Sequence, residues 1–340
     1  MKEMDVKEAS RAAGEPDISV IVPAYNAEPW ITETLHSVLD QTIDPAAYEI
    51  IVVDNGSQDH TLKVASEVLR SAPARVILSN ESQRGPSHAR NHGMRLACGS
   101  WIQFLDADDL LHRDKLVNQL NFAQTCSSDV ALVYSKWQDL DTRIKTRRTK
   151  VAPILPDLDH TATVTLVRSL ISDAGFIPTG SQLFRRSALT DVGGYKAVGI
   201  IEDVDLYIRI AMAGWRFAHC SSREPYFFYR RHEGSLSTGS TAAFADGVVR
   251  NAALVESWAR KRKILDQPLS TRLITCYFQA ARVFAECDWA RFDSVVERIE
   301  NLTGEVIPPG PRALTVLSKL VGYKTAERVA LSWRRLKRLA

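Results

Sequence analysis

Short apolar runs alternate with amphipathic segments through the first hundred or so residues of the chain. The runs are rich in β-branched residues and stop at polar or turn-forming residues, which is typical of buried strands. We predict strands at residues 18–22, 49–53, 75–78 and 101–105. Apolar residues at helical spacing predict helices at 32–39, 61–69 and 88–96. This alternation predicts an α/β fold with a mostly parallel central sheet and helices on both faces.

The pattern becomes less regular after residue 128 and changes again after Gly239. We predict a strand at 130–134, a polar and basic loop at 139–150, a helix at 204–213 and an aromatic strand at 225–231. Beyond Gly239 only helical periodicity is present. We therefore expect a disordered N-terminus at 1–16, an α/β domain at 17–239 and a helical C-terminal region at 240–340.

Composition and charge indicate which broad class of protein this is. The 340 residues are 45% hydrophobic and 24% charged, as in ordinary globular proteins. The net charge of +3 does not indicate nucleic acid as a partner, although residues 251–340 hold 16 Lys and Arg against 9 Asp and Glu. Five scattered cysteines without a C-x-x-C pair indicate reduced thiols. With neither a secretory signal nor a run of 18 apolar residues, we expect a cytoplasmic protein without a membrane-spanning helix.

Three carboxylates lie within four residues of one another directly after the predicted strand 101–105, in the sequence Asp106-Ala107-Asp108-Asp109. Like charges at this spacing repel unless something positive lies between them. A hard cation such as Mg²⁺ or Mn²⁺ fits, because it binds one or two carboxylates together with substrate phosphates. The alternative is a solvated loop or a helix N-terminus. The position after a buried strand favours the metal.

Further polar residues follow the other predicted strands, where parallel sheets bind their ligands. Asp54 ends the second strand and has an acceptor suited to the imide N–H of uracil or thymine, although Asn55-Gly56 is also a strong turn signal. Arg90 lies near the start of a predicted helix, from which it would reach a phosphate.

Two segments of the later part of the chain also carry candidate chemistry. Glu202 and Asp203 precede an amphipathic helix, where Asp203 is either a helix cap or a general base. Arg230, Arg231 and His232 form a basic cluster, which is either solvated surface or a site for a pyrophosphate leaving group.

Taken in order, these segments resemble the family 2 inverting glycosyltransferases, whose catalytic domain has the nucleotide-sugar-binding GT-A fold. The matching segments are residues 20–28, 53–59, 85–93, 104–109, 193–195, 202–209 and 229–237. Each motif is weak alone, but seven in register are strong. The resemblance covers about residues 17–237 and makes 17–239 the catalytic domain.

The resemblance implies roles for individual residues. A UDP- or dTDP-type base would be held near Pro23, Tyr25, Glu28 and Asp54, and Asp106 would lie by the ribose. Asp108 would bind Mn²⁺ or Mg²⁺, and His232 matches a histidine that contacts metal or pyrophosphate. Asp203 matches the catalytic base. The remaining expected substrate-binding residues are Asn55, Arg90, Glu202 and Arg231. The family commonly has aspartate where this chain has Asn55, which puts the usual base contact there in doubt.

The implied reaction moves a sugar from a nucleoside-diphosphate sugar to a hydroxyl of a glycan or lipid-linked acceptor, with inversion at the anomeric carbon. The diphosphate leaves without a proton, and one carboxylate takes the proton of the acceptor hydroxyl. A rival interpretation is a D-x-D phosphohydrolase, but three predicted β-α units precede the motif, whereas that class usually has it after the first strand. A second rival is an inactive nucleotide-sugar-binding scaffold, although both Asp108 and Asp203 are present.

The last residues of the chain form a basic amphipathic pattern. On a helix, Val329, Trp333, Leu336 and Ala340 share one face, surrounded by arginine and lysine. Such a helix binds anionic membrane surfaces, where a lipid-linked acceptor would be found. Packing against the protein's own domain is the alternative.

Overall fold

The computed structural model describes residues 14–141, 147–150, 162–171, 177–232, 240–309 and 311–339. The chain forms two compact units. The first unit contains residues 1–151, 178–193 and 218–230, and the second contains 152–177, 194–217 and 231–340. The predicted domain limits at 16 and 239 stay a prediction.

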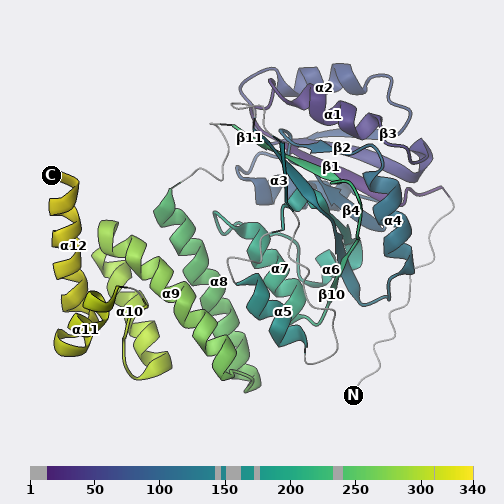
Figure 1. Ribbon diagram of the computed structural model, residues 1–340. Helices are drawn as coiled ribbons and strands as arrows, with labels where there is room; N and C mark the ends of the chain where they lie inside the picture. Colours follow the sequence, from purple (N-terminus) through teal and green to yellow (C-terminus); the bar gives the residue numbers. More distant parts are fainter. Residues whose placement is uncertain are drawn as a thin grey trace. The chain divides into compact units, whose positions relative to one another are not determined.

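A seven-stranded sheet with the order β10-β6-β9-β4-β1-β2-β3 forms the framework of the first unit (Figure 1). Its four parallel strands are β1 (Ile18–Ala24), β2 (Tyr48–Asp54), β3 (Arg75–Asn80) and β4 (Trp101–Phe104). The other three strands are β6 (Val130–Tyr134), β9 (Gln182–Arg185) and β10 (Arg216–His219). β9 runs antiparallel to both β4 and β6. The predicted α/β fold with a mostly parallel sheet is confirmed.

Helices cover both faces of this sheet. The strand order advances from β1 to β3 in one direction and then returns to β4 on the other side of β1. The connections from β1 to β2 and from β2 to β3 move the same way, so right-handed crossovers place their helices on one face. These are α1 (Ile31–Leu39) and α2 (Thr61–Leu69), which lie together in Figure 1. The return from β3 to β4 uses α3 (Pro86–Leu96), which packs on β1 and β2. α3 lies so close that a Cβ at Gly93 would be 2.3 Å from Ile21 Cγ2.

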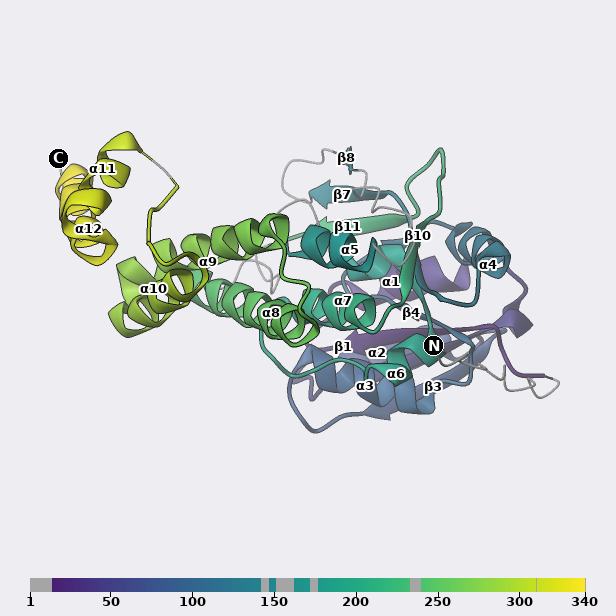
Figure 2. The same ribbon diagram turned by 90° about the horizontal axis from the view of Figure 1, so that it is seen from below.

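A second, four-stranded sheet of the first unit has the order β5-β11-β7-β8 (Figure 2). Its strands are β5 (Leu110–Leu111), β7 (Trp137–Asp141), β8 (Arg147–Lys150) and β11 (Phe227–Arg231). The prediction of a loop at 139–150 is therefore wrong for the paired residues of β7 and β8. Trp137 and Asp139 both point inward, and a buried aspartate hides the alternation that marks a strand.

A polar network lies inside the first unit between β4 and α4 (Lys115–Thr125). The Lys115 ammonium group is fully buried and donates hydrogen bonds to the side-chain oxygens of Gln103 and Gln119. It also donates to the carbonyl of Gln182, at 3.3 Å. Burial lowers the pKa of Lys115 well below its usual value.

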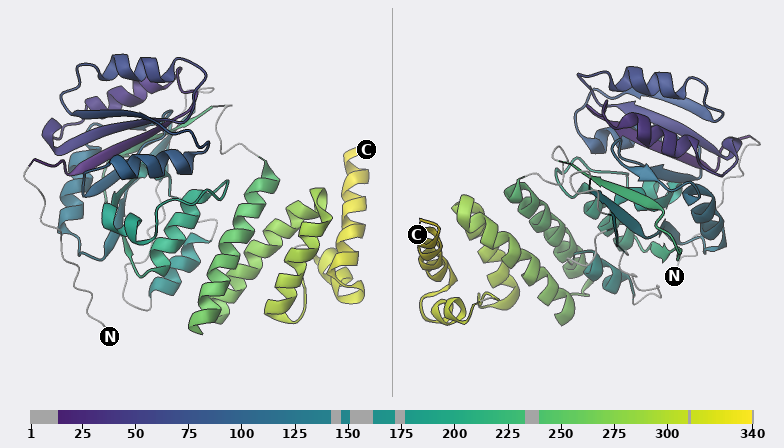
Figure 3. Two further views of the ribbon diagram at one scale, coloured as in Figure 1. Left: turned by 180° about the vertical axis from the view of Figure 1, so that it is seen from behind. Right: turned by 45° about the horizontal axis from the view of Figure 1, so that its top comes forward.

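The second unit consists mainly of helices over its described residues (Figure 3). Its helices are α5 (Ala162–Leu170), α7 (Glu202–Met212), α8 (Thr241–Arg262), α9 (Gln267–Cys287), α10 (Trp289–Thr303), α11 (Arg312–Val321) and α12 (Tyr323–Leu339). A short helix, α6 (Arg186–Asp191), belongs to the first unit. Side-chain oxygens of Ser240, Asp266 and Asp288 cap α8, α9 and α10, so each helix has a defined start. The predicted C-terminal helical region is confirmed.

Candidate active site

The acidic residues that follow the predicted strands, Asp54 and Asp106, lie at one edge of the seven-stranded sheet. β1 lies between β2 and β4, and all three strands run parallel. Asp54 pairs in register with Ala24 at the end of β1, and the Leu105 amide just after β4 donates to the Ile21 carbonyl at 3.0 Å. The chain segments that carry Asp54 and Asp106 therefore leave the sheet at the same edge.

Among the residues that the structure describes, hydrogen bonds reach one of the two carboxylate oxygens of Asp54. Its Oδ2 accepts the backbone N–H groups of Gly56 and Ser57, both at 3.2 Å. Its Oδ1 is buried and accepts no hydrogen bond from the part of the chain that the structure describes. A buried acceptor without a donor is unfavourable, so this oxygen is well suited to a ligand N–H.

Asn55 organises the loop that follows β3. Its side-chain NH₂ donates to the carbonyls of Glu81 (2.9 Å) and Gln83 (2.7 Å), and its Oδ1 accepts the Gly85 N–H at 2.7 Å. Aspartate has no N–H to donate to those two carbonyls. The departure from the usual family residue thus has a local structural reason, while the predicted substrate contact of Asn55 stays a prediction.

The loop held by Asn55 brings Arg84 over the exposed ring of Tyr25. The guanidinium carbon is 3.7 Å from the ring centre, and Arg84 also donates to the Gly56 carbonyl at 2.8 Å. Tyr25 is 47% exposed, so a flat platform faces solvent beside Asp54. Sequence reasoning missed Arg84, although it directly precedes the motif that begins at Gly85.

Pro23 and Glu28 lie where the chain leaves β1. Pro23 belongs to the strand and pairs in register with Val53. Glu28 Oε2 accepts the backbone N–H of His60 at 2.9 Å and contacts its Nδ1 at 3.2 Å. These contacts join the loop after β1 to the loop after β2, so Glu28 stabilises the shape of this edge.

Two arginines separate the carboxylates of the Asp106–Asp109 turn. Arg90 is buried on α3 and forms an ion pair with Asp106 (Nη2 to Oδ1, 2.7 Å). Its predicted phosphate contact stays a prediction. Asp109 is buried and accepts the backbone N–H of Arg230 at 2.7 Å. Burial, followed by the charges of Asp108 and Asp106, raises the pKa of Asp109 well above its usual value.

Arg230 clamps this turn through its side chain as well. Its Nε donates to the Asp108 carbonyl at 2.7 Å, and its Nη2 pairs with Glu33 of α1 at 2.5 Å. The guanidinium carbon also lies 4.9 Å from the centre of the Trp30 ring. Sequence reasoning placed Arg230 in a basic cluster but did not connect it with the acidic turn.

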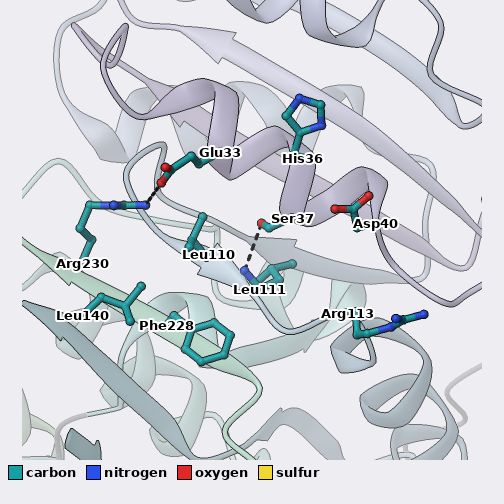
Figure 4. A pocket seen from close by; sticks show the side chains of 10 residues that line it. All are labelled: Glu33, His36, Ser37, Asp40, Leu110, Leu111, Arg113, Leu140, Phe228 and Arg230. Atoms are coloured by element: carbon teal, nitrogen blue, oxygen red, sulfur yellow. Dashed lines mark hydrogen bonds and ion pairs between the residues drawn. The ribbon is translucent and has the colours of Figure 1, made fainter. Parts of the chain in front are cut away.

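The Arg230–Glu33 pair also borders a hollow of about 570 Å³ in the first unit. Figure 4 shows the two side chains pointing toward each other above Leu110 and Phe228. The hollow is lined by α1, β5, β7 and β11. Arg230 is therefore a shared element of this hollow and of the acidic turn.

The turn fits a divalent cation that takes part of its ligands from a substrate. Among the described residues no three His, Cys, Asp or Glu side chains are grouped to hold a metal. Asp109 is turned into the protein, which leaves Asp106 and Asp108 as the carboxylates of the turn. Mg²⁺ and Mn²⁺ are typically bound by one or two carboxylates plus substrate phosphates, so this donor set suits them.

The candidate base lies in the second unit, at the start of α7. Glu202 and Asp203 are half-buried in the first helical turn, and Asp203 Oδ1 accepts the N–H of Val204 at 2.8 Å. Asp205 is buried and forms an ion pair with Arg209 at 2.7 Å. Arg231 and His232 also belong to the second unit, and their predicted roles stay predictions.

Residues 19–193 match the sequence model of glycosyl transferase family 2. The chain belongs to this family. It is 35% identical over 117 residues to the minor teichoic acid biosynthesis protein GgaB of Bacillus subtilis, covering 34% of this chain and 13% of that protein. It is 34% identical over 118 residues to the poly(ribitol-phosphate) beta-N-acetylglucosaminyltransferase TarS of Staphylococcus aureus, covering 35% and 21%. The chain thus aligns with only a small part of these curated relatives.

Solved structures support the fold. The crystal structure of Staphylococcus aureus TarS 1-349 in complex with UDP-GlcNAc has a TM-score of 0.69 at 18% identity, covering 94% of this chain and 92% of that one. The mannosyltransferase PcManGT of Pyrobaculum calidifontis, in complex with GDP-Man and Mn²⁺, has a TM-score of 0.54 at 20% identity, covering 96% and 90%. The predicted family and the GT-A fold are therefore confirmed, which removes the phosphohydrolase alternative.

The clamp predicts that Arg230→Gln weakens divalent cation binding, because the Asp108 main chain loses its side-chain anchor while the backbone bond to Asp109 remains. Hydrogen bonds to charged groups contribute about 1.5–3 kcal/mol, so we expect Mn²⁺ affinity to fall by about ten- to a hundredfold. Titration of Mn²⁺ in the presence of UDP, followed by electron paramagnetic resonance, measures this.

Glu33→Gln is the matched control, since it removes the outer ion pair of Arg230 and leaves the Asp108 contact in place. We expect its effect on Mn²⁺ affinity to be small, and Asp108→Ala defines the complete loss. Unchanged Mn²⁺ binding by a folded Arg230→Gln variant would contradict the clamp.

Proposed function

We propose that this family 2 member is an inverting, metal-dependent glycosyltransferase that uses a UDP- or dTDP-linked sugar. The observation that supports this donor class is the buried Oδ1 of Asp54, which has no donor among the described residues. Both neighbouring folds named above carry a nucleotide sugar, one with uracil and one with guanine. The fold alone therefore does not choose the base, and the choice depends on Asp54 and its surroundings.

A single acceptor favours an imide over the other bases. Uracil and thymine present one N–H between two carbonyls, which matches the one oxygen that Asp54 offers. Guanine presents two neighbouring donor groups, but the second oxygen of Asp54 already accepts two backbone N–H groups. Cytosine has an acceptor at the corresponding ring nitrogen and would face Asp54 without a proton. Tyr25 beside it supplies an aromatic face on which the base stacks.

Asp54→Asn tests this arrangement, because the amide places an NH₂ group where Oδ1 stands. An unmatched buried polar group costs about 1–3 kcal/mol, so UDP affinity should fall by about 5- to 150-fold while CDP binding improves relative to UDP. Calorimetric titration with UDP, dTDP, CDP and GDP in Mn²⁺ measures the change. The exposed Glu67→Gln on α2 is the control and should bind like the unmodified protein. Tighter binding of GDP than of UDP by the unmodified protein would contradict the proposed donor class.

Asp108 would hold the cation, which on binding neutralises charge on the diphosphate leaving group, and Asp106 would lie by the ribose. Arg90 keeps Asp106 in position through their ion pair. We assign Arg231 and His232 to the diphosphate, because a guanidinium and an imidazole stabilise developing negative charge. The acceptor hydroxyl gives its proton to Asp203 as its oxygen attacks opposite the leaving group, which inverts the anomeric carbon.

Asp203 should be the residue whose loss stops transfer and leaves donor binding intact. General-base catalysis contributes about 10²–10⁴-fold, so Asp203→Asn should lower the transfer kcat by that factor with little change in UDP affinity. Glu202→Gln is the matched variant one residue away, and it should cost less. Transfer assays with a nucleotide-sugar panel, together with UDP titration, measure both. A dead Glu202→Gln beside an active Asp203→Asn would move the base to Glu202. UDP binding by the unmodified protein without transfer from any donor of the panel would favour the scaffold alternative.

The acceptor is proposed to be a glycan or a lipid-linked glycan, in keeping with the teichoic acid proteins among the relatives. Among the described residues no helix is long and apolar enough to cross a membrane. The C-terminal helices nevertheless expose apolar side chains. Val329, Trp333 and Leu336 of α12 are 54%, 62% and 63% exposed, and Leu320 of α11 is 76% exposed. We propose that this basic helix pair contacts an anionic membrane surface.

The triple variant Val329→Ser, Trp333→Ser and Leu336→Ser should lose binding to anionic liposomes and retain UDP affinity. These side chains are exposed, so their replacement spares the buried contacts of Tyr323 and Ala326. Co-sedimentation with liposomes, with and without anionic lipid, measures binding. Phe244→Ser on α8 is the matched control, because Phe244 is 52% exposed outside the helix pair. Equal sedimentation of the triple variant and the control would refute the membrane contact.

A further inference from the structure

The turn before the candidate base has an unfavourable backbone conformation. Ile201 has φ of 60° and ψ of 37°, the left-handed region that β-branched residues rarely adopt. It directly precedes Glu202, and within the described residues Ile201 makes no side-chain cap hydrogen bond to α7. Conformations of this kind persist only where the surroundings hold them, and they are concentrated at functional sites.

Helix α8 of the C-terminal region holds this turn from one side. A Cβ at Gly247 would lie 2.6 Å from Ile201 Cγ1 and 2.8 Å from the Ile200 carbonyl oxygen, so only glycine allows this approach. Three residues later, Arg250 donates from Nη2 to the same Ile200 carbonyl at 3.3 Å. The helix backbone and one guanidinium therefore fix both residues that lead into α7.

The first turn of α7 is fixed independently by its own ion pair. Arg209 binds Asp205 through Nε and donates from Nη2 to the Gly194 carbonyl at 2.8 Å. The Asp205 amide also donates to the Ile201 carbonyl at 3.2 Å. Asp203 thus lies between two held points, the Ile200–Ile201 turn and the Asp205–Arg209 pair.

We propose that Gly247 and Arg250 are positioning residues for the transfer reaction, because they hold the strained turn that presents Asp203 to the acceptor. This inference rests on the proposed role of Asp203 as the base. The C-terminal region would then position the general base, a role separate from contact with the acceptor or the membrane. A displaced base loses efficiency steeply, since misplacement by about 1 Å lowers rates by about 10²-fold.

The test compares Gly247→Ala, Ile201→Gly and the double variant in transfer assays. Gly247→Ala should lower the transfer kcat by about 10²-fold with unchanged UDP affinity and donor KM, because the new methyl group displaces the turn. Ile201→Gly removes two of the three atoms that the methyl group meets and accepts a positive φ without strain. The double variant should therefore recover part of the lost kcat, since the contact of the methyl group with the Ile200 carbonyl oxygen remains. Arg250→Gln should lower kcat to a smaller extent.

Arg260→Gln is the matched control on the same helix, because Arg260 pairs with Glu256 and lies outside the turn. It should retain the unmodified kcat. Wild-type kcat in Gly247→Ala overturns the inference, and so does a kcat loss that comes with lowered Tm and UDP affinity and is not rescued by Ile201→Gly. Full transfer by Asp203→Asn would overturn the base assignment itself. The two failures are thus distinguishable within one set of variants.

Discussion

The edge of the sheet depends on how three carboxylates within four residues are kept apart. The negative charges of such a cluster repel one another. Two buried arginines from distant parts of the chain bind the turn and offset this repulsion. Arg90 pairs with Asp106 from α3, while Arg230 binds the turn at the Asp108 carbonyl and at the Asp109 side chain. The first and third carboxylates thus have defined partners inside the first unit. The shape of the hollow beside α1 depends on this arrangement, because Arg230 lines it.

Much of this edge could be predicted from the sequence, because the residues that end each strand are recognisable from their immediate neighbours in the chain. Strand ends are visible from β-branched runs, and parallel strands share one edge, so Asp54 and Asp106 were placed together without coordinates. Arg84 and Arg230 were not recognised, because their partners lie 28 to 197 residues away and leave no periodic trace. The strands β7 and β8 were taken for a loop because Asp139 occupies an inward position. The strained Ile201 has no signature in sequence at all.

At Asn55 and at Gly247, the residue type is required by contacts with a segment that is distant in the sequence. At Asn55 the requirement is for two donors toward the carbonyls of the 81–83 loop, which a carboxylate lacks. At Gly247 the requirement is the absence of a side chain, so that a helix reaches the backbone of another segment. In both cases the residue acts by placing a neighbour. Substitution patterns at such positions would follow the neighbour's geometry and not the reacting groups.

The buried Lys115 links folding of the first unit to proton concentration. Its lowered pKa means that the unfolded chain holds more protons than the folded chain at every pH between that lowered value and the ordinary lysine pKa of about 10.4. Folding therefore releases a proton in this interval, and the free energy of unfolding rises with pH. Raising the pH within this interval thus stabilises the folded first unit at the β4–α4 contact. Acidification weakens it by favouring an ammonium ion whose hydrogen-bond acceptors are the neutral amide oxygens of Gln103, Gln119 and Gln182.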